Sequence, residues 1–251
     1  MQRYFVARNQ LRGRSVVITG EDARHIERVV RLKEGDRVTV SDGAGRDVLA
    51  QITSFGNNSV LLETIEELKE NNEPRVQVWI AQSLPKGDKM ETVIQKCTEI
   101  GAVRFIPFLS ARTIVQYDAR KEQKRLERWN KIAKEAAEQA QRSIIPQIDL
   151  PRTWEQLLTV AREAGAAFLC YEKETSLNLK KALQSLDKSH FAGGDRPILL
   201  AVGPEGGFEL AEVEQFRESG GREISLGKRI LRTETAAASA LSCILYEFDE
   251  I

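Results

Sequence analysis

The apolar pattern of this chain changes near residue 75, and no other feature constrains its fold as strongly. Beyond that point, short apolar runs rich in β-branched residues alternate with amphipathic stretches of helical period. The apolar runs cover residues 76–81, 104–108, 166–170, 197–202 and 223–226, and the helical stretches cover 90–100, 121–142, 209–219 and 235–248, with another beginning near 179. This alternation is typical of βαβ units, so it predicts an α/β domain with a mostly parallel sheet.

The first 70 residues have a different pattern, in which short alternating runs are separated by turn residues. We expect strands at 15–18, 36–43, 48–52 and 59–63, and one helix at 22–32. Strands this short and closely spaced indicate a small β-barrel. A polar stretch at 66–74 is the best candidate for a linker. We therefore predict two domains, which cover residues 1–72 and 73–251.

The composition excludes several classes of protein. Lys plus Arg and Asp plus Glu both number 37 among 251 residues, so the formal net charge of zero excludes a uniformly basic, histone-like binder. No apolar run approaches the roughly 18–20 residues that cross a bilayer, and the first residues lack the apolar region of a secretory signal. Three widely spaced cysteines without a CxxC pair are typical of a reducing compartment. We therefore expect a cytoplasmic protein with no membrane contact.

Positive charge is nevertheless concentrated in two islands. Residues 1–33 carry eight basic and three acidic side chains, and so do residues 111–134, which leaves each island with a net charge of +5. Lys and Arg side chains bind nucleic-acid phosphates and release their counterions, so such islands fit an RNA backbone. For the first island we favour RNA binding, because it lies in the predicted barrel. For the second island a solvated helix face is an equally good interpretation.

Three predicted strands end in loops that could hold a small molecule. These loops cover residues 169–172, 202–208 and 226–236, and the second contains three glycines around Pro204 and Glu205. Ligands of open α/β sheets bind beyond the carboxyl ends of the strands, where glycine lets the backbone approach closely. The chain contains neither the GxGxxG motif of dinucleotide-binding folds nor a P-loop. An ordinary strand-to-helix turn would explain the glycine-rich loop by itself equally well.

Taken together, several motifs resemble those of one known family. They are GPEGG at 203–207, ILRTETA at 230–236, HIERVVRLKEGD at 25–36, LPKGDKME at 84–91, QKCTEIG at 95–101, and Glu135 to Gln139 with Arg142 and Pro146. Their order over nearly the whole chain resembles the SPOUT methyltransferases, and more narrowly the RsmE family of 16S ribosomal RNA uridine-N3 methyltransferases. The stretch 147–195 is the least distinctive part of the match.

The resemblance implies a fold, a cofactor, a partner and a substrate. The fold would be a PUA-like barrel followed by a SPOUT α/β domain with a C-terminal trefoil knot, although knots are rare in proteins. The cofactor would be S-adenosylmethionine, bound to a homodimer. The substrate would be N3 of the uridine at position 1498 of 16S rRNA, within or near the assembled small ribosomal subunit.

The resemblance also implies which residues bind the cofactor. All of them belong to the three loops or to the start of the last helix. They are Leu169, Tyr171, Glu172, Gly203, Glu205, Gly206, Leu226, Gly227, Ile230, Leu231, Thr233, Thr235 and Ala236.

We expect two catalytic residues in these loops, and no metal ion is needed for the chemistry. The uracil ring becomes anionic when N3 loses its proton, and the guanidinium of Arg232 can donate two hydrogen bonds to a planar anion. Arg232 could instead pair with Glu234. Glu205 could accept the N3 proton, orient the methyl group, or close its own loop by binding backbone amides. His25 is a weaker candidate for the base, because it lies in the N-terminal domain.

The candidate RNA-binding residues come from the two basic islands and from the matching motifs. They are Arg3, Arg8, Arg12, Arg24, His25, Arg28, Arg31, Lys86, Arg112 and Arg142.

Three other functions remain open at this stage. A SPOUT enzyme that acts on transfer RNA would use nearly the same chemistry. A non-catalytic ribosome-assembly factor could use the same basic islands, but it would not need three loops of this kind. An NAD-dependent α/β enzyme is disfavoured because the GxGxxG motif is absent.

Overall fold

A computed structural model describes residues 1–69, 72–114 and 119–251, apart from the side chains of Arg12 and residues 119–121. The chain forms two compact units, which are described separately. Unit 1 comprises Met1–Glu73 and Lys134–Ile145, and unit 2 comprises Pro74–Ala133 and Pro146–Ile251. The domain boundary expected after residue 72 remains a proposal, and unit 1 includes a segment from the middle of the chain.

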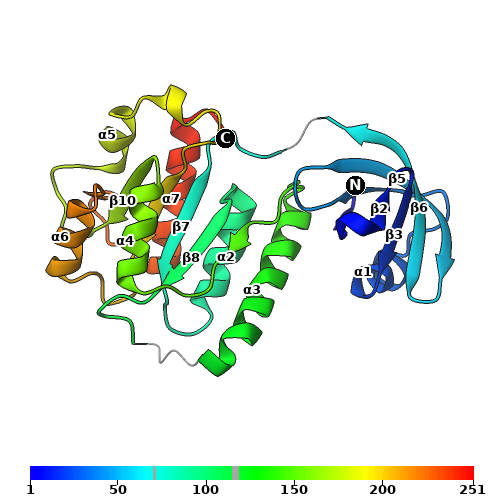
Figure 1. The fold of residues 1–251 in the computed structure, drawn as a ribbon, viewed down its shortest axis with the longest axis horizontal. Helices are drawn as coiled ribbons and strands as arrows, with labels where there is room; N and C mark the ends of the chain where they lie inside the picture. The colour runs from blue at the N-terminus through cyan, green and yellow to red at the C-terminus, as the bar shows by residue number, and fades with distance from the viewer. Residues whose placement is uncertain (70–71, 115–118) are drawn as a thin grey trace. The chain divides into compact units, whose positions relative to one another are not determined.

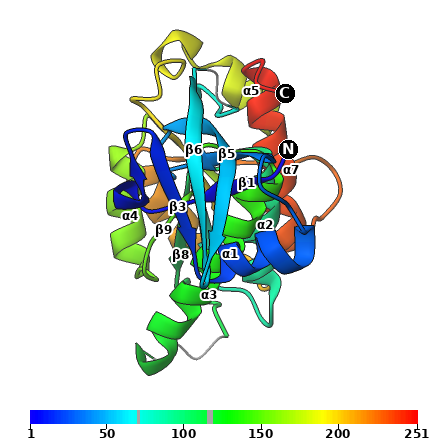
Figure 2. The same ribbon diagram turned by 90° about the vertical axis from the view of Figure 1, so that its right-hand side faces the viewer.

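Unit 1 is built on one curled sheet of six strands (Figures 1 and 2). In order across the sheet, the strands are β1 (Arg3–Phe5), β4 (Arg37–Ser41), β5 (Asp47–Gly56), β6 (Ser59–Leu68), β3 (Ser15–Thr19) and β2 (Leu11–Arg12). All pairs are antiparallel except β1 with β4. Alternate residues of β3 are buried, as expected for a strand with one face on a core.

The helical segment of unit 1 is short and irregular. It consists of a 3-10 turn η1 (Arg8–Gln10), the helix α1 (Glu21–Arg24) and a π-helical stretch η2 (His25–Val30). The segment ends where Arg31 adopts a left-handed conformation with φ 59°. The polar residues 66–68, expected in a linker, instead continue β6, and residues 70–71 of that stretch lie outside the described part of the chain.

Residues 134–145 are attached to the strands of unit 1 by buried polar contacts. The guanidinium of Arg142 lies 2.6 Å from a carboxylate oxygen of Glu73, which also accepts the backbone N–H of Ser143 at 2.8 Å. The hydroxyl of Ser143 donates to Asp47 at 2.6 Å, and Arg3 donates to the same oxygen at 2.6 Å. These contacts explain why a segment so distant in sequence folds with the N-terminal residues.

Unit 2 contains a six-stranded sheet in which every pair is parallel. In order across the sheet, the strands are β12 (Arg222–Ile224), β10 (Ala166–Cys170), β11 (Ile198–Val202), β7 (Val78–Ser83), β8 (Arg104–Phe108) and β9 (Gln147–Ile148). The prediction of a mostly parallel α/β sheet is confirmed. The sequence patterns did not indicate the short β9 or the edge strands β1 and β2 of unit 1.

The described residues form seven α-helices, of which α1 belongs to unit 1. Those of unit 2 are α2 (Lys89–Ile100), α4 (Trp154–Glu163), α5 (Leu179–Gln184), α6 (Leu210–Glu218) and α7 (Thr233–Glu247), while α3 (Ala119–Gln139) continues into unit 1 at Lys134. The 3-10 turn η3 (Lys188–His190) follows α5. Helices α2 and α5 both contact α7 on one face of the sheet, and α4 contacts α6 on the other (Figure 1).

The strand order reverses between β7 and β11. The chain moves from β7 through α2 to β8, but from β11 through α6 to β12 on the far side of β10. The loops after β7 and β11 therefore diverge to opposite faces of the sheet, which is where ligands bind in open α/β folds. Helix α7 then returns from the edge strand β12 to pack on β11 and β7. The trefoil knot stays a prediction.

Candidate active site

The carboxyl ends of β10, β11 and β12 surround a cavity of about 580 Å³. Its walls are residues 170–172, 202–208 and 225–233, which follow these strands, with Lys89 from α2 and Ala236 from α7. The volume falls within the roughly 300–1,000 Å³ of small-molecule sites. The structure thus brings together the three loops that the sequence singled out.

The loop after β11 owes its shape to glycine. A Cβ atom on Gly203 would lie 3.0 Å from the ring of Phe208, which is buried and stacks on Phe108 with ring centroids 6.3 Å apart. Gly207 has φ +67°, and a Cβ atom there would lie 3.1 Å from Glu172 Oε1. The glycines therefore let the backbone turn tightly over Phe208 and line the cavity without side chains.

A buried hydrogen-bond network holds this loop against α7. The hydroxyl of Thr233 donates to the carbonyl oxygen of Gly203 at 2.6 Å and accepts from Gln82 Nε2 at 2.8 Å. Gln82, at the end of β7, is fully buried, and Thr233 is the first residue of α7. The network joins the central strand, the glycine loop and the last helix. Gln82 was not predicted from the sequence, because its type and position carry no recognisable signal.

Glu205 closes its loop across the point where the strand order reverses. One oxygen, Oε1, accepts from Lys89 Nζ at 2.7 Å and from the backbone N–H of Lys86 at 3.1 Å. Burial works to raise the pKa of Glu205, but the hydrogen bonds from Lys89 and from backbone N–H groups outweigh it and lower the pKa below 4.5. Of the three roles considered for Glu205, the geometry favours closing the loop, because a carboxylate with a low pKa is a weak base.

The loop after β8 braces the glycine loop from another side. Arg112 Nη1 donates to the carbonyl oxygen of Gly206 at 2.9 Å. The buried carboxylate of Glu212 accepts the backbone N–H groups of Ala111 at 2.8 Å and Glu209 at 2.9 Å. Arg112, a candidate RNA-binding residue, is thus partly engaged in shaping the cavity.

Four basic side chains line the cavity: Lys89, Lys228, Arg229 and Arg232. The backbone carbonyl of Arg232 accepts from the N–H of Ala236 at 2.8 Å at the start of α7, while its side chain is exposed. Within the described residues Arg232 forms no ion pair, so the alternative of pairing with Glu234 is not observed. Its guanidinium is available to an anion in the cavity.

One thiol also borders the cavity. Burial raises the pKa of Cys170 to about 12, so the thiol stays protonated and is not a nucleophile. In the part of the chain that the structure describes, no group of three or more His, Cys, Asp or Glu side chains is placed to hold a metal ion.

Eleven of the thirteen expected cofactor residues line the cavity, and two do not. Leu169 is fully buried in β10 and points into the hydrophobic core, because side chains of a strand alternate between its faces. Thr235 is exposed on α7 outside the cavity wall. The side chains of Leu169 and Thr235 therefore do not line the cavity, and cofactor binding by these two residues stays a prediction. Lining residues that the analysis did not name are Lys89, Cys170, Val202, Pro204, Gly207, Phe208, Ser225, Lys228 and Arg229, nearly all neighbours of named residues in the same loops.

Most candidate RNA-binding residues are exposed. In unit 1 these are Arg8, Arg24, His25, Arg28 and Arg31, and in unit 2 they are Lys86 and Arg112. The side chain of Arg12 lies outside those that the structure describes.

Arg3 and Arg142 were predicted to bind RNA, but the structure buries both side chains. The side chain of Arg3 is 6% exposed and pairs with Asp47, and that of Arg142 is 3% exposed and pairs with Glu73. A buried guanidinium that is already paired has no free surface for a phosphate, and breaking such a pair strands a charge. Both residues therefore have a structural role in unit 1.

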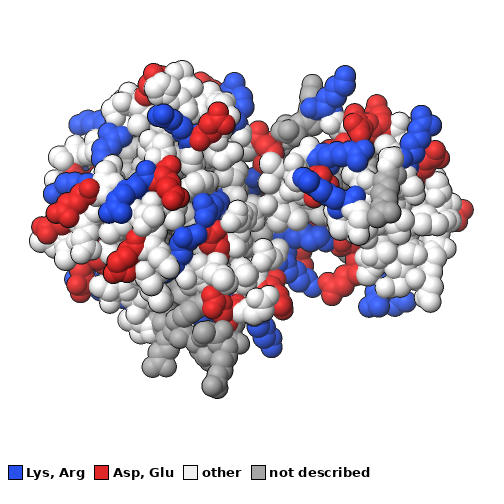
Figure 3. All heavy atoms as spheres, in the orientation of Figure 1, with Lys and Arg blue, Asp and Glu red and all other residues white. Residues whose placement is uncertain are grey.

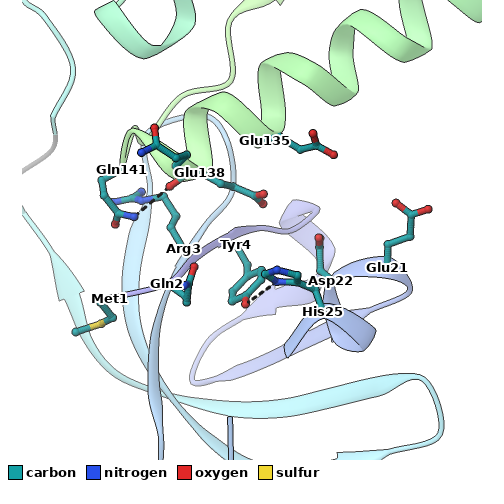
Figure 4. A pocket seen from close by; sticks show the side chains of 11 residues that line it. Met1, Gln2, Arg3, Tyr4, Glu21, Asp22, His25, Glu135, Glu138 and Gln141 are labelled. Atoms are coloured by element: carbon teal, nitrogen blue, oxygen red, sulfur yellow. Dashed lines mark hydrogen bonds between the residues drawn. The ribbon is translucent and has the colours of Figure 1, made fainter. Parts of the chain in front are cut away.

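A second cavity, of about 620 Å³, lies within unit 1 beside His25 (Figure 4). His25 Nδ1 lies 3.2 Å from the hydroxyl of Tyr4, whose pKa is raised to about 12 by burial and by the charges of Glu138 and Asp22. Lys134 Nζ bridges Asp22 at 2.6 Å and Glu138 at 3.2 Å. Because carboxylates surround this cavity, it is unsuited to phosphate, and we do not extend RNA binding from His25 into it.

Charge is finely mixed over the face of unit 2 that Figure 3 presents. Lys and Arg side chains there alternate with Asp and Glu, and no large patch of one sign is visible. Of the described residues of the second basic island, Arg128 pairs with Glu91 at 2.7 Å. Within the described residues, no helix is long and apolar enough to cross a membrane.

Comparisons with known proteins are consistent over the full chain. A family model described as an RNA methyltransferase domain matches residues 71–245, and one described as an RNA methyltransferase PUA domain matches residues 18–65. The chain is 40% identical to ribosomal RNA small subunit methyltransferase E of Bacillus subtilis over 98% of this chain and 97% of that protein. The corresponding protein of Synechocystis is 37% identical over 96% and 76% of the two chains.

A solved structure has the same fold. It is the crystal structure of a ribosomal RNA small subunit methyltransferase E from Neisseria gonorrhoeae bound to S-adenosyl methionine. It is 28% identical to this chain, covers 98% of this chain and 97% of its own, and superposes with a TM-score of 0.85.

Proposed function

The chain belongs to the RsmE family of ribosomal RNA small subunit methyltransferases, and on that basis we propose that it methylates N3 of the uridine at position 1498 of 16S rRNA. The observation that carries this proposal is the cavity at the ends of β10, β11 and β12. It combines loops that expose backbone groups with the guanidinium of Arg232, which has no ion-pair partner among the described residues.

The residues of the cavity fit S-adenosylmethionine, the cofactor of this rRNA methyltransferase. Carbonyl and N–H groups of the glycine loops suit the adenine and ribose, and Leu226, Ile230 and Leu231 supply apolar walls. A Cβ atom would lie 3.0 Å from Phe208 on Gly203 and 3.1 Å from Glu172 on Gly207, and Gly207 also has φ +67°, so the cradle is shaped for glycine. When bound, the cofactor supplies a methyl group on a positively charged sulfur.

Arg232 performs the electrostatic part of the reaction. N3 of uracil is a poor nucleophile until its proton leaves, and the resulting negative charge spreads onto the two carbonyl oxygens that flank it. A guanidinium that donates hydrogen bonds to the uracil anion stabilises this charge. The N-cap position of Arg232 fixes its backbone, which places the side chain beside the cavity.

Glu205 acts through position rather than by taking the proton. Its contacts with Lys89 and Lys86 hold the glycine loop against the loop after β7. Arg112 and the Gln82–Thr233 pair hold the same loop from other sides. A loop braced in this way keeps donor and acceptor aligned, and alignment alone can contribute several kcal/mol to the rate.

We also propose which residues bind the RNA and in which oligomeric state and compartment the protein acts. The exposed residues Arg8, Arg24, His25, Arg28 and Arg31 of unit 1, together with Lys86, bind the RNA backbone in or near the small ribosomal subunit. The protein acts as a homodimer in the cytoplasm, as the family resemblance implies.

Two measurements test the proposal. Calorimetric titration with S-adenosylmethionine, with NAD as control, should show saturable binding of the methyl donor alone. Small subunits that lack the modification should then acquire 3-methyluridine at position 1498, detected by mass spectrometry of nuclease fragments. Methylation at another atom, or of transfer RNA instead, would refute the proposed specificity.

One variant tests the role of Arg232. We expect Arg232→Ala to lower kcat by about 100- to 1,000-fold, the range for losing one fixed donor to an oxyanion. Folding and cofactor affinity should be largely kept, because the side chain is exposed and unpaired among the described residues. Full activity of this variant would remove Arg232 from the mechanism.

A further inference from the structure

Lys89 lines the cavity and braces Glu205, but its positive charge has no assigned role in the reaction. It is the first residue of α2, directly after the loop that follows β7, while Arg232 directly precedes α7 after β12. The two cationic groups therefore reach one cavity from different strand ends.

Lys89 differs from the other basic lining residues in being held in place. Its Nζ lies 2.7 Å from Glu205 Oε1, and its side chain is only 35% exposed. Lys228 and Arg229 are exposed and, among the described residues, form no hydrogen bond or ion pair. A cation that is fixed before the substrate arrives stabilises developing charge more effectively than one that must first be ordered.

The ammonium group of Lys89 has capacity left for a ligand. It carries three N–H donors, and Glu205 uses one of them. The oxygen of Glu205 that accepts it also accepts the backbone N–H of Lys86, so the carboxylate is fixed as well. Within the part of the chain that the structure describes, two donors of this positioned ammonium therefore remain for an acceptor in the cavity.

The uracil anion has two carbonyl oxygens, and each of them can accept a hydrogen bond from a cationic donor. When N3 loses its proton, negative charge appears on O2 and O4, which lie on opposite sides of N3. One guanidinium placed beside one of these oxygens leaves the other oxygen to water or to a second cation.

We propose that Lys89 is a second catalytic residue, which donates a hydrogen bond to one uracil carbonyl oxygen while Arg232 donates to the other. This inference rests on the proposed uridine-N3 activity. In the step, the N3–H bond breaks and its proton passes to water, and the lone pair of N3 forms the new N–C bond. The electron pair of the broken carbon–sulfur bond stays on sulfur.

The test compares Lys89→Met, which keeps the length but loses the charge, with Lys89→Arg and with Glu205→Gln. For Lys89→Met we expect kcat to fall about 100-fold, as for other fixed oxyanion donors. The calorimetric Kd for S-adenosylmethionine should rise no more than it does for Glu205→Gln, because both variants weaken the same Lys89–Glu205 contact. The pH profile of kcat should move to higher pH, because the N3 proton is then harder to remove. Lys89→Arg should restore part of kcat and return the profile toward that of the wild type.

A substrate with a more acidic N3–H provides a second test of the role of Lys89. Small subunits reconstituted with 16S RNA that contains 5-fluorouridine present a more acidic N3–H. The defect of Lys89→Met should shrink on this RNA, because the anion needs less stabilisation. Glu205→Gln should weaken cofactor binding but leave the pH profile in place and show the same defect on both RNAs, since Glu205 positions the loop.

Each outcome decides between the two roles of Lys89. If Lys89→Met weakens cofactor binding and loses kcat equally at every pH and on both RNAs, Lys89 only braces the loop and the proposal is overturned. If the wild type itself forms no 3-methyluridine, the proposed function fails first. Should Lys89→Met fold poorly, Lys89→Gln gives the same decision, because its amide can donate to Glu205 but carries no charge.

Discussion

Replacing Thr233 by valine probes the network that fixes the glycine loop. Valine has nearly the shape of threonine, so the change removes a hydroxyl without leaving a cavity. Thr233 Oγ1 donates to the Gly203 carbonyl at 2.6 Å and accepts from Gln82 Nε2 at 2.8 Å, and both threonine and glutamine are buried. The variant therefore strands one acceptor and one donor away from water.

The expected cost follows from these two bonds. A neutral hydrogen bond contributes about 0.5–1.5 kcal/mol, and a stranded buried partner costs about 1–3 kcal/mol. Gln82 Nε2 retains its hydrogen bond to the carbonyl of Ser83 at 2.9 Å and weaker contacts with the carbonyls of Gly203 at 3.4 Å and Val202 at 3.5 Å, which offset part of the loss. We therefore expect a loss of about 2 kcal/mol in the free energy of unfolding, or roughly 4–8 °C in the Tm of unit 2.

The assay combines differential scanning calorimetry with titration of S-adenosylmethionine. Cofactor affinity should fall, because the loop that the network holds lines the cavity. Thr235→Val is the matched control: Thr235 lies two residues along the same helix, is exposed and lies outside the cavity wall. If Thr233→Val and Thr235→Val have the same Tm and the same Kd, the network does not support the site and this reasoning is wrong.

Three further outcomes are expected. Gly203→Ala places a Cβ atom 3.0 Å from the buried ring of Phe208, so chemical denaturation should show a loss of about 1–3 kcal/mol, as for other overpacked cores; unchanged stability would mean that the ring moves freely. Replacing Arg8, Arg28 and Arg31 together by alanine should reduce the slope of log K for RNA against log salt by roughly 0.7–0.9 per lost phosphate contact, whereas removing three exposed arginines of unit 2 away from the cavity should not. The pKa of Glu205 is lowered in spite of burial, so its ionised form stabilises the loop above pH 4.5 and this stabilisation is lost as the pH falls through the lowered value. The difference in Tm between the wild type and Glu205→Gln should accordingly be largest near neutral pH and shrink in acid, and a difference independent of pH would contradict the role of the Lys89–Glu205 pair.

The strands and helices of unit 2 were largely predictable, because their patterns are local. The apolar runs at 166–170 and 197–202 became the neighbouring parallel strands β10 and β11, and both are buried on two faces. Runs without alternation are typical of strands covered by helices on both sides. By contrast, β1, β2 and β9 are only two or three residues long, too short for any periodicity to appear.

The cavity was predictable as a set of loops but not side chain by side chain. Glycines in the loop at 202–208 pointed correctly to close approach of the backbone, and eleven of the thirteen expected cofactor residues line the cavity. The Leu169 side chain does not reach the cavity, because a one-residue step along a strand reverses the direction of the side chain. Arg3 and Arg142 failed because charge counting does not distinguish an exposed arginine from one buried against a carboxylate.

By itself, the sequence determined the fold class and the family, since both depend on local periodicity and on motifs that are contiguous along the chain. It also located the loops of the site. Only the tertiary structure decided that Lys89 pairs with Glu205, 116 residues away, and that Gln82 reaches Thr233. Both contacts exist because β7 lies beside β11 in the sheet, and strand order depends on the packing of the whole unit rather than on any local pattern.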